Sequence, residues 1–207
     1  EDLVKSGELA NRKYRIAHFD SEDRRGIDCA LLYDENRMTV LEKEKLVVRI
    51  PDNENYLTRD ILFVKSKLNN DEILHVFVNH WSSRREGVAE SEHKRVRAAQ
   101  VLLQKIQEIK KVEPEAKILV MGDFNDNMRQ AKSGMRRIRE DFQLSDPLHD
   151  TIGSSSFKTY QRGRRHIDFA LCTKEFSEAL RSCGYKPFSH RLASDHRAMF
   201  FDFDTEK

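Results

Sequence analysis

Short apolar runs alternate with polar connections through the first part of the chain, a pattern typical of β-strands. Six runs rich in β-branched and aromatic residues have the length of a strand, and they cover residues 14–19, 27–33, 38–41, 46–50, 60–64 and 72–81. The polar sequence Asp34-Glu35-Asn36-Arg37 separates the second and third runs and predicts a hairpin turn. We therefore expect this part of the chain to consist mainly of strands.

The hydrophobic period changes between residues 91 and 112. Apolar residues now recur at helical spacing, at Val96, Ala99, Leu102, Leu103, Ile106 and Ile109. Ser91 is suited to cap the start of a helix, and Lys110 and Lys111 suit its C-terminal end. The pattern predicts one long amphipathic helix.

The remaining segments predict more strands than helices. Residues 116–122 indicate a buried strand, residues 127–141 a helical or irregular segment, and residues 157–160, 166–172 and 197–203 three further strands. Many strands with a few helices favour an α+β sheet sandwich over a helical bundle or a regular βαβ array. With 207 residues and no linker or repeat, we expect a single domain over residues 1–207.

Composition excludes some classes of protein. Charged residues make up 35% of the chain, and no apolar run approaches the roughly 20 residues that span a bilayer, so the sequence predicts a soluble protein. Lysine and arginine total 37 and the acids 35, so a general positive field for nucleic acid is absent. Polyanion binding would need local clusters such as Arg162, Arg164 and Arg165, which face phosphate or form solvated surface.

Cysteine usage and the ends of the chain do not indicate a compartment. The chain has three cysteines without CxxC spacing, and we expect buried free thiols rather than a disulfide. The first residue is Glu1 and no signal-like segment follows, so we expect a processed or cut N-terminus.

Chemically active side chains stand where predicted strands end. Leu74, Val76 and Val78 share one face of their strand by the period of two, and the next position on that face is His80. The imidazole either bonds a backbone carbonyl at the strand end or belongs to a functional site. The neighbouring Trp81 is expected to pack in the core rather than stack on a base.

The sequence Gly122-Asp123-Phe124-Asn125-Asp126 follows the buried strand over residues 116–122. On an extended backbone Asp123 and Asn125 would point to the same side, which aims a carboxylate and a carboxamide at one place. Glycine, aspartate and asparagine are also common in turns, so a simple turn remains an equal alternative.

Asp168 lies inside an otherwise apolar predicted strand, and a buried charge costs several kcal/mol unless it is paired. The sequence Ser194-Asp195-His196 opens the last predicted strand, where adjacent side chains point to opposite sides. We therefore pair Asp168 with His196, so that the acid orients the imidazole and Asp195 is left to hold a cation.

These positions form one candidate set: His80, Asp123, Asn125, Asp168, Asp195 and His196. The chain has neither a Gly-x-Ser-x-Gly motif nor a phosphate-binding P-loop motif, which argues against a serine hydrolase and a P-loop protein. Oxygen ligands combined with imidazoles suit magnesium-assisted attack of water on a phosphate ester.

Four segments resemble, in order and approximate spacing, the motifs of the endonuclease/exonuclease/phosphatase superfamily. They are Asn79-His80-Trp81-Ser82-Ser83-Arg84, Gly122-Asp123-Phe124-Asn125-Asp126, Ile167-Asp168-Phe169 and Ser194-Asp195-His196. The resemblance extends from about Arg25-Gly26-Ile27-Asp28 to the C-terminus. It implies a four-layer α/β/β/α sandwich of two mixed sheets, with the active site at one rim.

The resemblance also implies roles for individual residues. Asp123 would orient or deprotonate the attacking water, and Asn125 would donate a hydrogen bond to the reacting phosphate. His80 and His196 would stabilise the pentavalent phosphorus, with Asp168 supporting His196. The implied activity is hydrolysis of a phosphate ester by a phosphodiesterase or nuclease, with nucleic acid among the candidate substrates.

Asp195 resembles a metal ligand for Mg²⁺ or Mn²⁺, and Arg25 either contacts substrate phosphate or is a solvated arginine. Family members begin with two strands, the second ending in a metal-binding glutamate, that have no counterpart here. We therefore expect a longer natural protein, weak metal binding, and sheet surfaces exposed to self-association. The alternative function is a noncatalytic phosphate-binding or scaffold module of the same fold.

Overall fold

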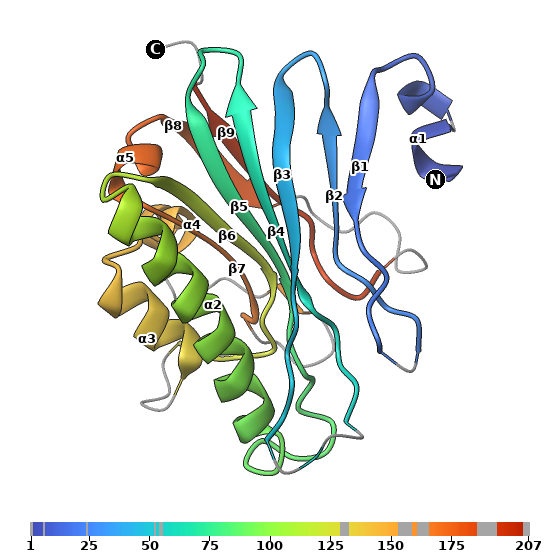
Figure 1. Ribbon diagram of the computed structural model, residues 1–207, viewed down its shortest axis with the longest axis vertical. Coiled ribbons are helices and arrows are strands. Elements are labelled where there is room, and N and C mark those ends of the chain that lie inside the picture. The colour runs from blue at the N-terminus through green and yellow to red at the C-terminus, as the bar shows by residue number, and fades with distance from the viewer. Residues whose placement is uncertain are drawn as a thin grey trace.

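The computed structural model describes residues 2–5, 7–23, 25–51, 53, 56–128, 133–152, 159–160, 166–185 and 194–204. A five-stranded sheet lies at its centre (Figure 1). Its strands, in spatial order, are β3 (Met38–Leu46), β4 (Ile61–Leu68), β5 (Ile73–His80), β6 (Lys117–Asp123) and β7 (Asp168–Cys172). Every neighbouring pair is antiparallel except β5 and β6. A parallel pair needs a crossover connection, and α2 (Glu92–Val112) provides it.

Helices α2 and α3 (Gly134–Asp141) cover one face of this sheet (Figure 1). Leu102 and Ile106 of α2 are fully buried, as the helical period of the sequence predicts, and they belong to the same core cluster as Phe77 and Ile118 of the sheet. Ser91 stands at the N-cap position, but its hydroxyl bonds the carbonyl of Gly87 instead of capping the helix.

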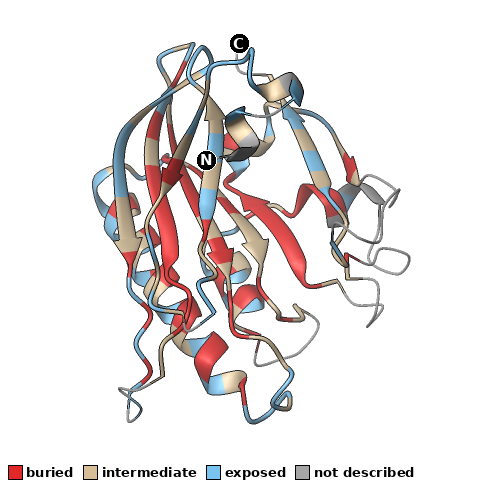
Figure 2. Cartoon of the chain, turned by 90° about the vertical axis from the view of Figure 1, so that its right-hand side faces the viewer, coloured by how far each residue is buried: buried red, intermediate tan, exposed pale blue. Residues whose placement is uncertain are grey.

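Two short sheets pack on the opposite face of the central sheet. One pairs β1 (Tyr14–His18) with β2 (Ala30–Asp34), and the other pairs β8 (Leu180–Tyr185) with β9 (Met199–Phe203). Ala17 and Phe203 from these sheets belong to the same core cluster as Val64 and Val76 of the central sheet. Phe63, which precedes Val64, and Phe77, which follows Val76, belong to the other cluster, on the helix side of the sheet. Figure 2 shows the buried residues concentrated in the central strands. The fold is thus the mixed α+β sandwich that the sequence predicted.

The remaining described helices are short: α1 (Asp2–Lys5), a 3₁₀ turn η1 (Gly7–Leu9), α4 (Pro147–Ile152) and α5 (Lys174–Ser177). No helix in the described part of the chain is long and apolar enough to cross a membrane. The three cysteines are free, and two of them, Cys29 and Cys172, are buried as expected.

The separate strand predicted over residues 46–50 is wrong. The preceding strand instead continues to Leu46, with a register shift between Val40 and Glu42, and then leaves the sheet. Burial still alternates, since Leu46, Val48 and Ile50 are buried. However, the Val48 amide donates to the Asp60 carboxylate at 3.1 Å rather than to a neighbouring strand. The alternation of apolar residues therefore predicted burial correctly, but the segment is a loop that faces the core and not a strand.

Other predicted elements are present with different bounds, and one observed strand was not predicted. The strand predicted over residues 27–33 begins only at residue 30, and the segment 127–141 contains helix α3. The sequence did not predict β8. Of the segment 157–160, only the last two residues are described, and Tyr160 forms an isolated bridge with His196. The cluster Arg162, Arg164 and Arg165 lies outside the described residues.

Candidate active site

Three of the candidate residues meet at one edge of the central sheet. His80 ends β5, Asp123 ends β6 and Asp168 begins β7. The register places His80 beside Asp123, and Asp123 beside Asp168. Because β7 runs antiparallel to β6, the start of one strand adjoins the end of the other, which explains why residues so distant in sequence converge.

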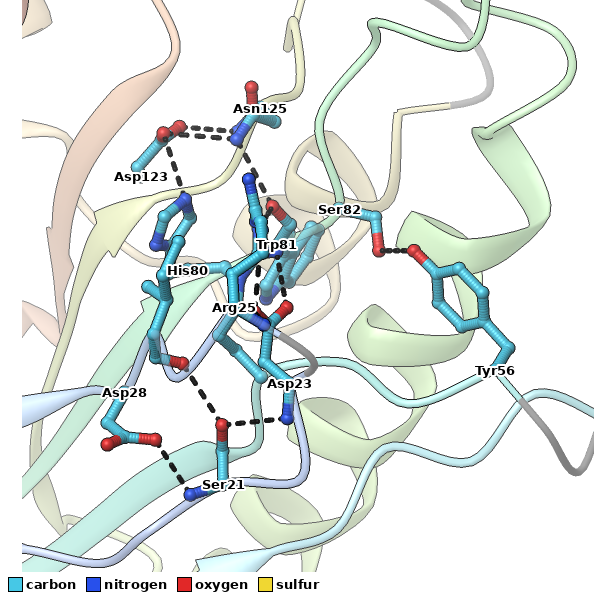
Figure 3. Close-up of polar contacts among 12 residues, drawn as sticks. Ser21, Asp23, Arg25, Asp28, Tyr56, His80, Trp81, Ser82, Asp123 and Asn125 are labelled. Atoms are coloured by element: carbon cyan, nitrogen blue, oxygen red, sulfur yellow. Dashed lines mark hydrogen bonds and ion pairs between the residues drawn. The ribbon is translucent and has the colours of Figure 1, made fainter.

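A tight turn after β6 fixes the Asp123 carboxylate. Its Oδ1 accepts the Asn125 backbone N–H at 2.8 Å, and its Oδ2 accepts the Asn125 side-chain amide at 3.0 Å (Figure 3). Asn125 adopts a positive φ of 47°, and Gly122 a φ of 139°. A Cβ at Gly122 would lie 1.9 Å from the Asn79 carbonyl oxygen, so only glycine fits there. The segment is therefore a turn, as one alternative predicted, and this turn also holds the carboxylate of the candidate site.

Asn125 lines the cleft, but its side-chain amide already has two protein acceptors. Besides Asp123, its Nδ2 donates to the Trp81 carbonyl at 3.1 Å. Donation from Asn125 to a substrate phosphate stays a prediction, and it requires this side chain to give up one of these bonds. Trp81 itself is 2% exposed and packs edge-on against Phe124 with ring centres 5.0 Å apart, as predicted for a core residue.

Two imidazoles face the same carboxylate oxygen. Asp123 Oδ2 lies 3.7 Å from Nε2 of His80 and 3.8 Å from Nε2 of His196. The other ring nitrogen of His196, Nδ1, lies 3.0 Å from both oxygens of Asp168, so the predicted pairing of these two residues is present. The hydroxyl of the buried Thr159 accepts the Asp168 backbone N–H at 3.1 Å and helps to hold that carboxylate.

Burial and neighbouring charges shift three pKa values in the site. Burial, followed by the negative charge of Asp168, raises the pKa of Asp123 to about 6. Burial, followed by the positive charge of Arg59, lowers the pKa of His80 to about 4. The hydrogen bond to Asp168 raises the pKa of His196 above its usual value. The site therefore combines a weakly acidic carboxyl, a neutral imidazole and an imidazole whose cationic form is stabilised by the Asp168 carboxylate.

Sequence reasoning missed two arginines that support the site. Arg59 is 6% exposed, and it donates to the carbonyls of His80 and Trp81 at 3.1 and 2.7 Å and to Asp23 at 3.1 Å. Arg84 donates to the Asn125 carbonyl at 2.7 Å, which ties the turn to the segment after β5. Arg84 could have been predicted for the site because it belongs to the same motif as His80. The sequence around Arg59 gave no indication of its partners.

A cleft of about 650 Å³ opens over this edge of the sheet. All seven residues singled out from the sequence line it: Arg25, His80, Asp123, Asn125, Asp168, Asp195 and His196. Residues not predicted for the site also line it, among them Arg59, Arg84, Arg85 and Tyr160. Arg25 is exposed, and its backbone and side chain bond Asp23, so both a contact with substrate phosphate and a solvated side chain stay open for it. The structure thus brings together every predicted position.

The donor atoms of the site fit a hard divalent cation. Asp123, Asp168 and His196 each offer a ligand atom within 4.8 Å of the others, and Asp195 adds a third carboxylate to the cleft. Burial raises the pKa of Asp123 most, and the negative charge of Asp168 adds to it; a cation beside these carboxylates would relieve both penalties. Oxygen-rich sites of this kind suit Mg²⁺ or Mn²⁺ rather than softer metals.

The family of the chain follows from a sequence comparison. A sequence model of the Endonuclease/Exonuclease/phosphatase family matches residues 1–144, which is more than half of the chain. The chain belongs to this family, whose members are phosphoesterases and nucleases that generally use divalent metal ions. No curated protein sequence matches the chain.

Solved structures share the fold at low sequence identity. The D. rerio TDP2 structure complexed with single-strand DNA product has a TM-score of 0.71 at 15% identity, covering 99% of this chain and 81% of that one. The Bacteroides thetaiotaomicron mannosyl-6-phosphatase gives 0.70 at 15% identity, covering 98% and 80%. The human Nocturnin catalytic domain with bound sulfate gives 0.63 at 15% identity, covering 92% and 73%. These likenesses establish the fold.

Proposed function

We propose that this chain is a divalent-metal-dependent hydrolase of phosphate esters, acting as a phosphodiesterase or nuclease through in-line attack of water. The observation that supports this most strongly is the Asp123 carboxylate oxygen with two imidazole Nε2 atoms near it, at 3.7 and 3.8 Å. A proton acceptor close to two hydrogen-bond donors, inside a cleft with several arginines, suits a reaction that builds negative charge on phosphorus oxygens.

In this proposal Asp123 removes the proton from the attacking water. A general base works best when its pKa lies near the working pH, and the pKa of about 6 makes Asp123 a stronger base than an ordinary aspartate while it remains ionised at neutral pH. Its two hydrogen bonds from Asn125 hold the carboxylate in one orientation. Orientation of the base is part of what an enzyme provides before the reaction begins.

The two histidines stabilise the charge that develops on the phosphoryl group. His196 favours its cationic form because it bonds Asp168, so its Nε2–H donates a charge-assisted hydrogen bond to a phosphoryl oxygen. The low pKa of His80 keeps that ring neutral, and it donates a weaker hydrogen bond to the phosphoryl group. Arg25, at the mouth of the cleft, contacts the substrate phosphate.

Asp195 would hold the divalent cation, with water completing its coordination shell. When bound, Mg²⁺ or Mn²⁺ neutralises charge on the phosphoryl oxygens. In this proposal Asp123 is the base and Asp168 is bonded to His196, so Asp195 is the one carboxylate assigned to the metal. A single carboxylate makes a weak site, so we expect about millimolar metal to be needed for full activity. The TDP2 structure that shares this fold contains a DNA product, and another relative is a sugar phosphatase, so DNA ends and sugar phosphates are the first substrates to test.

The experiment is a hydrolysis assay on DNA, RNA, nucleotides, inositol phosphates and simple phosphomonoesters and phosphodiesters, with Mg²⁺, Mn²⁺ or EDTA. Wild-type protein should hydrolyse at least one ester in a metal-dependent way, and Asp123→Ala and His196→Ala should abolish this without loss of fold by circular dichroism. Arg37→Ala is the control, because Arg37 is exposed at the opposite end of the sheet. Turnover that is indifferent to EDTA would contradict the proposal.

One observation favours the second candidate, a noncatalytic phosphate-binding module. The described residues that line the cleft include aspartates but no glutamate, so the protein ligands for a cation are few. This candidate predicts that phosphate esters bind with an affinity that depends on His196 but are not hydrolysed at any metal concentration. Calorimetric binding together with an absence of product would favour it over the enzyme.

We also propose that the chain self-associates through its sheets. In the described part of the chain β8 and β9 pair only with each other, as do β1 and β2, so each short sheet has strand edges without a paired strand there. Unpaired strand edges are templates for pairing with another chain. Sedimentation velocity between 1 and 100 μM, a range typical for weak association, should show dimers or larger species, and a monomer throughout would contradict this.

A further inference from the structure

A second pocket adjoins the catalytic cleft. This side pocket has a volume of about 550 Å³, and it shares Arg25, Arg59, Ser83 and Arg85 with the cleft. Tyr56 and Glu86 line the side pocket and not the cleft. Figure 3 shows Arg25 between His80 and Asp123 on one side and Ser82 and Tyr56 on the other. A ligand in the cleft can therefore continue past the shared arginines into the side pocket.

The charges around this junction are not balanced. Asp23 is bonded by Arg59 and Arg25, and Glu86 is bonded by Lys94, so both acids of the side pocket already have cations as partners. Arg85 is exposed, and it has neither a hydrogen bond nor an ion pair with any residue of the described ranges. Among the residues that the structure describes, this arginine at the junction of the two pockets therefore has no anionic partner.

The wall of the side pocket is well fixed. The Tyr56 hydroxyl lies 3.2 Å from the Ser82 hydroxyl, and the ammonium group of Lys94 lies 3.9 Å from the centre of the Tyr56 ring. Lys94 is itself 8% exposed and bonded to Glu86. The aromatic wall is therefore held in place before any ligand binds, which reduces the entropy cost of binding.

We propose that the side pocket binds a second phosphate group of the substrate, with Arg85 as its main charged contact. This inference rests on the proposed function and narrows its substrate class to esters that carry at least two phosphate groups. A nucleic-acid strand and a bisphosphorylated polyol both have this chemistry. Arginine is suited to it because its planar guanidinium binds phosphate oxygens through two parallel hydrogen bonds.

The test is calorimetric binding in EDTA, where turnover is suppressed. The probes are thymidine 5′-monophosphate against thymidine 3′,5′-bisphosphate, and inositol 1-phosphate against inositol 1,4-bisphosphate. In at least one pair the bisphosphate should bind about tenfold tighter, since a charge-assisted hydrogen bond contributes this much. A preference only in the thymidine pair indicates a nucleic-acid strand, and one only in the inositol pair indicates a polyol phosphate. Equal affinities within both pairs would overturn the proposal.

Two variants assign the preference to the side pocket. Arg85→Ala should reduce the ratio of bisphosphate to monophosphate affinity about tenfold, and Arg85→Lys should reduce it less because the charge remains. Glu86→Gln removes a negative charge that only the side pocket contains and frees Lys94, so bisphosphate should bind about two- to fivefold tighter. Arg37→Ala is the control and should leave the ratio unchanged.

The outcome is separable from that of the proposed function. Binding that depends on Arg85 without hydrolysis of any ester would support the side pocket and contradict the enzyme. Metal-dependent hydrolysis that requires His196, with a bisphosphate preference that is the same in Arg85→Ala, would support the enzyme and overturn the side pocket.

Discussion

Asp168 holds His196 by one ring nitrogen, with Nδ1 at 3.0 Å from both carboxylate oxygens. This leaves Nε2 of His196 facing the cleft, 3.8 Å from Asp123. The same carboxylate of Asp168 also raises the pKa of Asp123 by charge repulsion. A single buried acid therefore controls both the imidazole that stabilises charge and the carboxylate proposed as the base.

Asp168→Asn should lower kcat about 100-fold or more, because the asparagine no longer favours the cationic, correctly oriented imidazole. It should also move the acid limb of the pH–rate profile to lower pH, since burial still raises the pKa of Asp123 but the charge of Asp168, the second cause, is gone. The measurement is kcat against pH for wild type and variant. Asp71→Asn, an exposed site in the β4–β5 turn, is the matched control. A lower rate with an unshifted acid limb would indicate a purely structural role.

The wild-type profile itself should show the titration of Asp123. The base must be ionised, so log(kcat/KM) should rise with pH through the folded-state pKa of about 6, and it should fall again only where His196 loses its proton. His80, with a pKa near 4, stays neutral across this range and should add no limb of its own there. The assay is run at saturating metal, so that metal binding does not supply the slope. A rate that is constant between pH 5 and pH 7 would contradict the assignment of Asp123 as the base.

Asp123→Asn should abolish turnover and yet stabilise the folded chain above pH 6. The pKa of Asp123 is raised on folding, so the wild type loses stability as pH rises from the unfolded value of 3.8 through about 6. The asparagine carries no charge, so the stability of the variant does not fall over this pH range for that reason. The amide keeps one acceptor oxygen, so one of the two hydrogen bonds from Asn125 is lost. After allowance for that bond, the gain at pH 7.5 should be about 1–2 kcal/mol.

Urea unfolding of both proteins at pH 4 and pH 7.5 measures this difference. The wild type and Asp123→Asn should have closer midpoints at pH 4, where the aspartate is largely protonated in the folded state, and should separate at pH 7.5. An Asp123→Asn variant that is less stable than wild type at pH 7.5 would show that the carboxylate is held by favourable contacts rather than strained by burial.

The sequence predicted the site better than it predicted the exact strands. The period of two placed His80 on a core face at a strand end, and the cost of an unpaired buried charge led to the pairing of Asp168 with His196. Both arguments use local pattern and simple electrostatics, which do not require the fold to be known. The hydrophobic alternation over residues 46–50 also reported burial correctly, but a strand needs a hydrogen-bonded neighbour, and one segment alone does not show whether it has one.

Arg59 shows what the sequence could not reveal. Its partners are two carbonyls at the end of β5 and the carboxylate of Asp23, and only the packed structure brings them together. The side pocket beside it is likewise a product of tertiary packing, since its lining comes from separate segments of the chain. Long-range contacts of this kind leave no periodic signal in the residues that make them.

Arg59 should be among the residues on which stability depends most. Arg59→Met leaves the Asp23 carboxylate, which is 7% exposed at its side chain, without its buried partner. It also removes a donor from the carbonyls of His80 and Trp81, of which the Trp81 carbonyl keeps the Asn125 side-chain amide as a donor. Removal of one member of a buried ion pair typically costs about 3–5 kcal/mol. Arg49→Met, which breaks an ion pair with Glu22 at the surface, should cost less than about 1 kcal/mol and is the control.

Two further measurements separate the charge of Arg59 from its packing. Adding Asp23→Asn to Arg59→Met should recover at least about 1 kcal/mol, because the unpaired carboxylate is removed. In the folded Arg59→Met variant, the pKa of His80 should rise from about 4, since the charge of Arg59 is, after burial, the main reason for its low value. NMR titration of the His80 ring follows this directly. An unchanged His80 titration would show that burial alone keeps the ring neutral and that Arg59 serves only to hold the end of β5.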